Sequence, residues 1–247
     1  MYDIIVFAHL FKPHLGGLEK YIETFYTNIP KKKILIITSK YKKTLDTEEQ
    51  FKNLHILRTD SIKVINDKYY IPSIKGIKQI WNIFKESYKN NPEIHTHTRF
   101  YFTNFLASLF AKNKNLIHFH FEHGSSFVRD GSFLIRILSI IFDNTLARYT
   151  LKSSTLVFTI SDSVKEFLTK HYKNLFYGPT LYNSLNFKNK EFKNKSKPEI
   201  PRLLFVGRLV KSKGIYELLE ACKILKEEHF SFTLTIIGDG SERSFVE

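Results

Sequence analysis

Short apolar runs recur along the chain and alternate with stretches in which apolar residues follow helical spacing. Runs of this kind, rich in Val, Ile, Leu and Phe, are typical of parallel strands that are covered on both faces. On this pattern the predicted strands are residues 2–8, 33–38, 55–57, 94–97, 116–121, 155–160, 202–206 and 233–237.

The stretches between these runs predict helices. In the first of them, Leu18, Ile22 and Phe25 have the three- and four-residue spacing of one helix face. In another, Ser163 and Glu166 have the spacing of a capping box. Strands that alternate with helices predict an α/β fold with parallel sheets and right-handed crossovers. The predicted helices are residues 17–28, 74–88, 132–149, 163–170 and 216–228.

A change of composition marks a domain boundary. Residues 187–201 read FKNKEFKNKSKPEIP, which is rich in Lys and Asn, holds two prolines and has no sustained apolar period. Such a segment is typical of an exposed linker. A new predicted strand begins directly after it. We therefore expect an N-terminal domain at residues 1–186 and a second unit at residues 202–247.

Composition narrows the classes of protein. Of the 247 residues, 43% are hydrophobic and 25% charged, which excludes general disorder. The single cysteine, Cys222, excludes an intrachain disulfide and a zinc site built on thiolates. The net charge of +14 favours anionic partners such as phosphates, nucleic acid or acidic lipid. The chain shows neither a signal peptide pattern nor a run long enough to span a membrane, so we expect a cytoplasmic protein.

Paired glycines lie between the first predicted strand and the first predicted helix. Gly16 and Gly17 allow backbone N–H groups to approach a ligand closely, and the start of the helix favours an anion. Glu19 follows two residues after Gly17. The spacing is not that of the dinucleotide fingerprint G-x-G-x-x-G. An ordinary turn between strand and helix is the alternative interpretation.

Histidines gather at the ends of two predicted strands. His95 and His97 share one strand face, as do His118 and His120, so each pair could hold a metal in a hydrolase-like site. Packing and hydrogen bonding within the sheet is the interpretation we favour, because no carboxylate set accompanies them. His123 differs, since it lies where a strand gives way to a loop, the position at which open α/β sheets bind ligands. It is our candidate for a polar active-site group.

The second unit carries the most specific segment. Arg208 and Lys213 flank a short loop between a strand and an amphipathic helix, and a guanidinium beside an ammonium suits a diphosphate. Two solvated cations are the alternative. Later in the unit, Gly238 and Gly240 flank a turn after the last predicted strand, where glycine would let the backbone approach a nucleotide.

These segments, taken in order, resemble the retaining glycosyltransferases of family 4, which have the GT-B fold. The resemblance spans the whole chain and is most specific in VGRLVKSKG (residues 206–214) and TIIGDGSER (residues 235–243). Weaker parts of the ordered set are Gly16-Gly17-x-Glu19, the strand-end His123-Gly124, Ser161 before a helix and Asn183 at the end of the first domain. Taken alone, Ser161 predicts a helix cap and Asn183 an Asn-rich turn.

The resemblance implies a hexosyltransferase-type enzyme with two Rossmann-like domains. Residues 1–186 would bind the acceptor, and the second domain would bind a UDP- or GDP-linked sugar as substrate, with retention and with neither a metal nor another cofactor. Arg208 and Lys213 would hold the donor diphosphate, and His123 would lie beside the transferred sugar as the catalytic group. The cleft for donor and acceptor would be lined by Gly16, Gly17, Glu19, Ser161 and Asn183, and the nucleotide would lie near Gly207, Gly238 and Gly240.

The family pattern continues beyond the GDG turn with further strand–helix units and a late pair of glutamates that grip the donor. Residues 202–247 supply none of these. We therefore expect an incomplete second domain that is thinly packed. The corresponding alternative function is a truncated, non-catalytic remnant, or a split subunit whose partner chain supplies the rest of the donor domain.

The resemblance also narrows the partners. It implies a glycan or a lipid-linked acceptor in the synthesis of a cell-surface polysaccharide, and the net charge of +14 favours peripheral contact with the inner face of the cell membrane. The helix at 132–149 is apolar over more than one stripe, which suits such contact or burial between neighbours. We expect no nucleic-acid partner, because the chain has no helix-turn-helix, zinc finger or RRM signature.

Overall fold

The computed structural model describes residues 2–65, 69–127, 132–183 and 199–247 of the chain. The chain divides into two compact units, Met1–Leu185 and Asn186–Glu247, which we describe one at a time. Of the predicted linker, residues 187–201, only the last three lie within the described part. No helix in the described ranges has both the length and the apolar content that crossing a bilayer requires.

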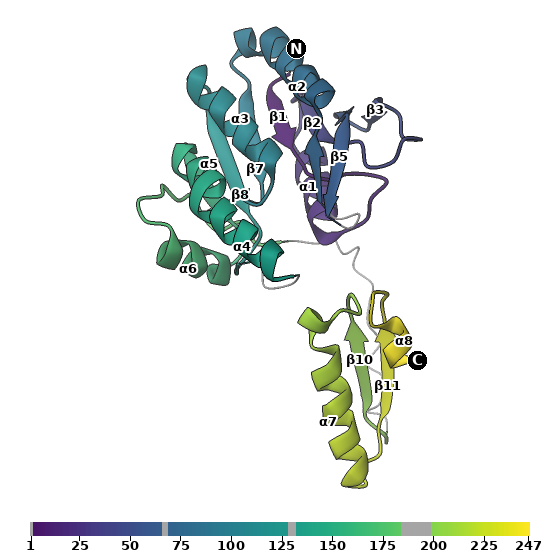
Figure 1. Ribbon diagram of the computed structural model, residues 1–247. Helices are drawn as coiled ribbons and strands as arrows, with labels where there is room; N and C mark the ends of the chain where they lie inside the picture. Colours follow the sequence, from purple (N-terminus) through teal and green to yellow (C-terminus); the bar gives the residue numbers. More distant parts are fainter. Residues whose placement is uncertain (1, 66–68, 128–131, 184–198) are drawn as a thin grey trace. The chain divides into compact units, whose positions relative to one another are not determined.

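Unit 1 is built on a seven-stranded sheet (Figure 1). Its strands are Ile4–Phe7 (β1), Ile34–Ser39 (β2), Glu48–Phe51 (β3), Leu54–Thr59 (β4), Glu93–His97 (β7), His118–Glu122 (β8) and Leu156–Thr159 (β9). They follow the order β3-β4-β2-β1-β7-β8-β9, and all neighbours are parallel except β3 and β4. Chain order reverses at β1, which pairs with β2 on one side and with β7 on the other. Open α/β sheets bind ligands at the carboxyl ends of strands beside such a reversal.

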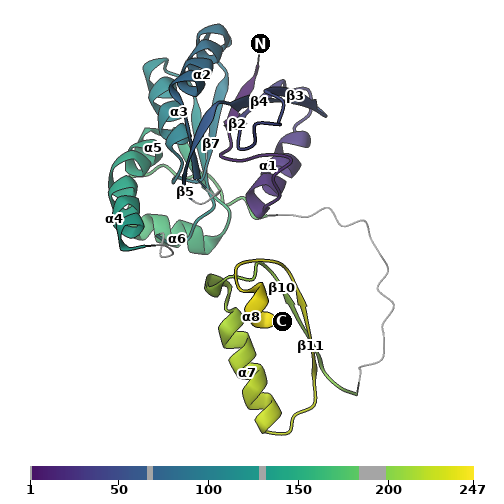
Figure 2. The same cartoon turned by 45° about the vertical axis from the view of Figure 1, so that its right-hand side comes forward.

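The helices of unit 1 are Gly17–Thr27 (α1), Ile74–Ser87 (α2), Phe102–Asn113 (α3), Phe133–Phe142 (α4), Arg148–Ser153 (α5) and Asp162–His171 (α6). Helices cover both faces of the sheet, as Figure 2 shows for α1 and for α2 with α3. Phe7 packs in one buried cluster with Phe84 of α2 and Phe110 of α3. Val6, the preceding residue of β1, packs in a second cluster with Ile22 of α1. Successive residues of β1 therefore serve opposite faces, which explains why the whole strand is apolar and buried.

The helix predicted at residues 132–149 is present and continues to Ser153, but its winding changes after Phe142. A π-helical segment, Asp143–Ala147, separates α4 from α5. Asp143 opens this segment and is buried, with its Oδ1 accepting a hydrogen bond of 3.0 Å from Nε of Arg99. The extra residue per turn lets the carboxylate face a buried cation, a contact that hydrophobic spacing does not encode.

The sequence pattern did not predict α3 or a small antiparallel hairpin made of β5 (Ser61–Ile65) and β6 (Tyr69–Pro72). The reason is clearest for α3, which packs on several neighbours at once. Its buried residues include Thr103, Asn104 and Ser108 beside the apolar ones, so its sequence shows no single apolar stripe.

Unit 2 is a small α/β unit. Its parallel strands are Arg202–Val206 (β10) and Thr233–Ile237 (β11), and its helices are Lys211–Lys213 (η3, a 3₁₀ turn), Ile215–Glu227 (α7) and Arg243–Val246 (α8). Leu209 and Ile215 are the only buried residues that the structure describes in residues 199–247. Leu204, Val206 and Ile237 are all more than half exposed. The expectation of thin packing is therefore confirmed for the described part of this unit.

Candidate active site

The turn between β1 and α1 brings Gly16, Gly17 and Glu19 together. A Cβ on Gly16 would lie 2.2 Å from the carboxylate of Glu19, so only glycine permits this carboxylate to fold back over the start of the helix. Oε1 of Glu19 lies 2.9 Å from Nδ1 of His14. A Cβ on Gly17 would meet open space, so Gly17 is the more accessible of the two glycines.

His123 follows directly after β8 and is half-buried. Its Nε2 lies 3.1 Å from Nδ1 of His97, and its ring meets the ring of Tyr21 edge-on at 4.8 Å. Burial lowers the pKa of His123 to about 4. The imidazole is therefore neutral at pH 7 and carries one donor and one acceptor nitrogen.

The loop that follows His123 is held by a buried ion cluster. Arg99 and Glu122 are both fully buried, and Nη1 of Arg99 donates to Oε1 of Glu122 over 3.0 Å. The same carboxylate oxygen accepts the backbone N–H of Gly124 over 2.8 Å, while Nη2 of Arg99 donates to the carbonyl of Ser126 over 2.8 Å. Burial alone would raise the pKa of Glu122, but Arg99 and the hydrogen bonds outweigh it and lower the pKa to about 2.

A backbone reversal delivers Arg99 to this cluster. Residues two apart in a strand share a face, yet His97 points toward α1 while Arg99 meets Glu122 on the opposite face. Between them Thr98 has φ 64°, the left-handed region that a β-branched residue rarely adopts. Asn104 holds the bend, because its Nδ2 donates to the carbonyls of both His97 and Thr98.

The other histidines divide between the two faces of the sheet. His95 and His97 lie under α1, where both contact the hydroxyl of Tyr26. His118 and His120 lie on the opposite face, where both contact Oγ1 of Thr96. Within the described ranges, no three His, Cys, Asp or Glu residues form a group that could hold a metal ion. The two pairs do not converge, because they belong to opposite faces.

Ser161 and Asn183 are less informative. Ser161 is the N-cap of α6, and its Oγ accepts the N–H of Val164 over 3.3 Å. Asn183 is exposed and ends a described range. The neighbouring Tyr182 donates its hydroxyl hydrogen to the carboxylate of Asp162 at the start of α6. The segment before residue 184 therefore reaches the end of β9 at the same edge of the sheet as His123.

In unit 2 the loop after β10, with Gly207, and the loop after β11, with Gly238 and Gly240, interlock. Leu209 donates its N–H to the carbonyl of Asp239 over 2.9 Å, and Gly207 donates to the carbonyl of Ile237 over 3.0 Å. A Cβ on Gly238 would lie 1.8 Å from the carbonyl oxygen of Gly207, and one on Gly240 would lie 2.2 Å from that of Leu209. Both glycines are thus required by the close approach of the two loops.

The interlocked loops display Arg208 and Lys213. Both side chains are exposed, and neither has an ion pair or side-chain hydrogen bond with any described residue. Gly214, with φ 75°, is the N-cap of α7 and follows directly after Lys213. The two cations are therefore presented beside the start of a helix at the carboxyl end of β10.

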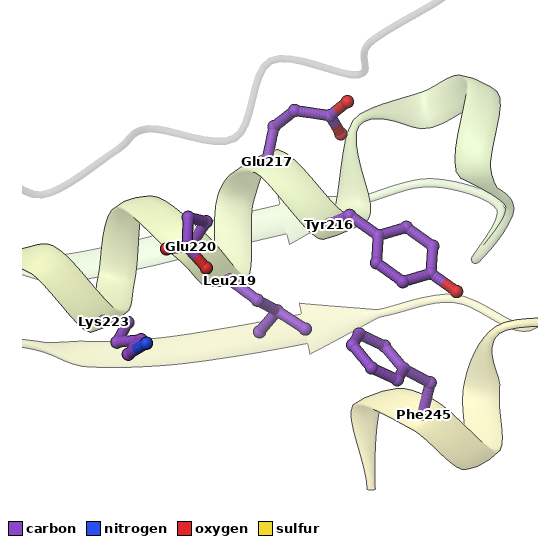
Figure 3. Close-up of a pocket in the computed structure, with 6 residues that line it drawn as sticks. All are labelled: Tyr216, Glu217, Leu219, Glu220, Lys223 and Phe245. Atoms are coloured by element: carbon purple, nitrogen blue, oxygen red, sulfur yellow. The ribbon is translucent and has the colours of Figure 1, made fainter.

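Figure 3 shows a groove of about 450 Å³ elsewhere in unit 2. The rings of Tyr216 and Phe245 form one wall, with centroids 4.6 Å apart. None of the residues that the sequence singled out lines this groove. The candidate donor-site residues of this unit therefore lie in its loops and not in this groove.

Sequence reasoning missed Arg99, Glu122 and Tyr26. The signal for the first two was present, since a charged residue follows one buried strand and another ends the next. Charges at such places require partners. Tyr26 gave no signal, because a tyrosine on the apolar face of a helix is ordinary core.

Comparison with known proteins agrees with this geometry. The model described as Glycosyltransferase Family 4 matches residues 15–174, and the model described as Glycosyl transferases group 1 matches residues 186–247. An uncharacterized glycosyltransferase of Methanocaldococcus jannaschii, MJ1069, is 32% identical over 258 residues, which cover 97% of this chain and 64% of that protein. The chain thus spans less than two thirds of the length of this relative.

Solved structures support the same fold. Anabaena HepE in complex with UDP and glucose has a TM-score of 0.62 at 12% identity, covering 100% of this chain and 64% of that chain. The galactosyltransferase WaaB has a TM-score of 0.60 at 16% identity, with coverages of 98% and 62%. Sucrose-phosphate synthase from Thermosynechococcus elongatus has a TM-score of 0.57 at 14% identity, with coverages of 97% and 71%.

The parallel sheet of unit 1, with its strand-end residues, and the start of a second α/β unit define a protein of the GT-B type. The predicted fold class, with an incomplete second Rossmann-like domain, is confirmed. The chain belongs to glycosyltransferase family 4.

Proposed function

We propose that the protein transfers a sugar from a nucleotide-sugar donor to a hydroxyl group of an acceptor. The observation that carries this proposal is the placement of the ordered motifs at the carboxyl ends of parallel strands, in a chain that belongs to glycosyltransferase family 4. His123 follows β8 in unit 1, and Arg208 follows β10 in unit 2. Both strand ends are the positions at which such sheets bind ligands.

The donor would be a UDP- or GDP-linked sugar. Arg208 and Lys213 are exposed and have no partner among the described residues, so their charges are available for a diphosphate. As the sugar leaves, negative charge grows on the diphosphate, and the two cations would stabilise that charge. Gly207, Gly238 and Gly240 would keep the backbone of both loops close to the nucleotide.

Unit 1 would hold the acceptor and orient the sugar. His123 is neutral and retains a hydrogen-bonding nitrogen for a substrate hydroxyl. Gly16, Gly17 and Glu19 would border the donor phosphate or the acceptor, and Ser161 and Asn183 would lie farther along the same edge. We propose that transfer proceeds with retention by front-face attack, with the leaving diphosphate oxygen accepting the proton of the attacking hydroxyl.

The acceptor would be a glycan or lipid-linked molecule of a cell-surface polysaccharide, reached at the inner face of the membrane. Support comes from α4, whose exposed large apolar residues are Phe133, Leu134, Ile137, Leu138, Ile140 and Ile141. Arg136 lies among them and the chain is strongly basic, which suits an anionic surface. Binding to anionic vesicles that weakens with salt would support this placement. Absent or salt-insensitive binding would contradict it.

A thermal-shift assay with UDP-glucose and GDP-mannose tests the proposed donor site. A ligand at 100 times its Kd stabilises the folded state by about 2.7 kcal/mol. We expect one of these donors to raise the melting temperature, and we expect Arg208→Ala or Lys213→Ala to abolish the rise. Lys226→Ala, which removes an exposed cation from α7 of the same unit, should leave it unchanged.

Release of the free nucleotide in the presence of acceptor would then show transfer. Binding without transfer would favour a binding subunit that needs a partner chain. If neither donor stabilises the protein, the proposed donor site is wrong.

A further inference from the structure

A continuous chain of hydrogen bonds runs along β7 beneath α1 and ends at His123. Oε2 of Glu93 lies 3.2 Å from Nε2 of His95, and Nδ1 of His95 lies 2.9 Å from the hydroxyl of Tyr26. The same hydroxyl lies 2.8 Å from Nε2 of His97, whose Nδ1 lies 3.1 Å from Nε2 of His123. Four hydrogen bonds thus connect the amino end of β7 with the loop after β8.

The chemistry of the first group sets the direction of the whole chain. A carboxylate can only accept, so Nε2 of His95 must donate to Glu93, and its Nδ1 must then accept from Tyr26. The tyrosine has one hydrogen, which it has given to His95, so its oxygen accepts from Nε2 of His97. Nδ1 of His97 is consequently an acceptor, and the hydrogen in this last bond must come from Nε2 of His123.

The three histidines of this hydrogen-bond chain, His95, His97 and His123, are neutral, as that assignment requires. His95 is 4% exposed and His97 is fully buried, and burial lowers the pKa of both. Burial likewise raises the pKa of Tyr26 well above its usual value, so its hydroxyl keeps its hydrogen. The hydrogen bond from His95 lowers the pKa of Glu93, whose side chain is 35% exposed. The carboxylate therefore stays ionised at the end that meets solvent.

We propose that Glu93, His95, Tyr26 and His97 are positioning residues that fix the tautomer of His123, with hydrogen on Nε2 and a free acceptor at Nδ1. No described residue forms a hydrogen bond with Nδ1 of His123. This inference rests on the proposed function for its use: the fixed acceptor would select a substrate group that donates, such as a sugar hydroxyl. A hydroxyl that donates there directs its oxygen lone pairs away from the imidazole, which orients the sugar before transfer.

The local sequence provides a matched pair of substitutions. Tyr26→Phe removes the hydroxyl that joins His95 to His97, so nothing then determines which nitrogen of His97 carries hydrogen. Tyr21 lies on the same helix and its ring meets the rings of both His97 and His123, but its hydroxyl has no hydrogen-bond partner among the described residues. Tyr21→Phe therefore changes the same surroundings without breaking the chain.

Nuclear magnetic resonance of histidine-¹⁵N-labelled protein at pH 7 tests the proposal, because a ring nitrogen that carries hydrogen has a different shift from one that does not. His123→Asn would assign the signals. We expect hydrogen on Nε2 of His123 in the wild type and after Tyr21→Phe. We expect the Nδ1–H form to become the major or an equal population after Tyr26→Phe. Glu93→Lys, which replaces an acceptor by a donor near the surface, should shift His123 in the same direction without a core substitution.

Hydrogen on Nδ1 in the wild type, or a His123 tautomer that ignores both Tyr26→Phe and Glu93→Lys, would overturn the proposal. The measurement needs no substrate, so it is separate from the test of transfer. The expected tautomer, with His123 signals that respond to neither UDP-glucose nor GDP-mannose, would support the hydrogen-bond chain and contradict the proposed function.

Discussion

The two faces of the sheet at β7 and β8 carry hydrogen-bond networks that use the same residue types but end on different groups. On the α1 face, neutral groups link Glu93 to the side chain of His123. On the opposite face, His118, Thr96 and His120 lead to Glu122, which accepts from His120 over 3.1 Å and pairs with Arg99. The network on the α1 face ends on the ring of His123. The network on the opposite face ends on the buried ion pair of Arg99 and Glu122, which holds the backbone of the next loop. Because side chains alternate along a strand, neighbouring residues of β7 and β8 join separate networks, one that reaches the backbone of the next loop and one that reaches the ring of His123.

The largest expected loss of stability comes from breaking the ion pair of Arg99 and Glu122. Arg99→Gln would leave Glu122 and Asp143 buried without their cation, and losing one partner of a buried ion pair costs about 3–5 kcal/mol of the free energy of unfolding. Urea unfolding followed by circular dichroism would measure it. Arg99→Lys, which keeps the charge but not the forked geometry, should lose less. Arg136→Gln on exposed α4 should lose little, and equal losses for Arg99→Gln and Arg136→Gln would contradict the structure.

Acid should lower the stability of the fold through a histidine on each face of the sheet, His118 and His123. Burial lowers the pKa of His118 to about 3 and that of His123 to about 4, against about 6.5 in the unfolded chain. The unfolded chain then binds protons that the folded chain refuses, so stability is complete above about pH 6.5 and falls as the pH drops toward these values. We expect each histidine to contribute a loss on the order of 2–3 kcal/mol by pH 4.5.

The urea midpoint, measured at intervals between pH 7 and pH 4.5, would give the slope of stability against pH. Removing one group, by His118→Gln or by His123→Gln, should flatten it. His229→Asn serves as the control, because His229 is exposed and its φ of 60° suits asparagine. A slope that neither substitution on the sheet changes would show that these histidines are not buried as neutral groups.

A smaller loss of stability should follow from breaking the neutral hydrogen-bond chain beneath α1. Tyr26→Phe leaves a donor on His97 and an acceptor on His95 without a partner, and an unsatisfied buried group costs about 1–3 kcal/mol. Because no charge is stranded, the loss should be less than that from Arg99→Gln. Unfolding under the same conditions tests this order, and a reversed order would mean that the neutral chain carries more of the stability than the ion pair.

The smallest effect should come from Tyr21→Phe. The hydroxyl of Tyr21 is buried without a described partner, and burial raises its pKa to about 12. Removing an unsatisfied polar group should change the free energy of unfolding by less than about 0.5 kcal/mol, or increase it slightly. A loss as large as that from Tyr26→Phe would reveal a hydrogen bond that the geometry does not show.

Sequence pattern alone predicted the alternation of strands and helices well, because burial on both faces makes each run of β1 or β2 apolar. It located His123 and the glycine motifs, since strand ends are readable from where an apolar run stops. It could not predict the role of Tyr26, whose partners His95 and His97 are about 70 positions away in the chain. Nor could it predict the π-helical segment at Asp143, because Arg99, the buried partner of this carboxylate, is 44 positions away in the chain.

The interlocked glycines of unit 2 have a consequence for how such sequences change over time. An alanine at position 238 or 240 fits only if the loop of Gly207 and Leu209 withdraws, and Arg208 would move with it. The two motifs are therefore sterically coupled, although residues 215–234 separate them in the chain. A variant with a larger residue in the second motif should survive selection only with a compensating change in the first.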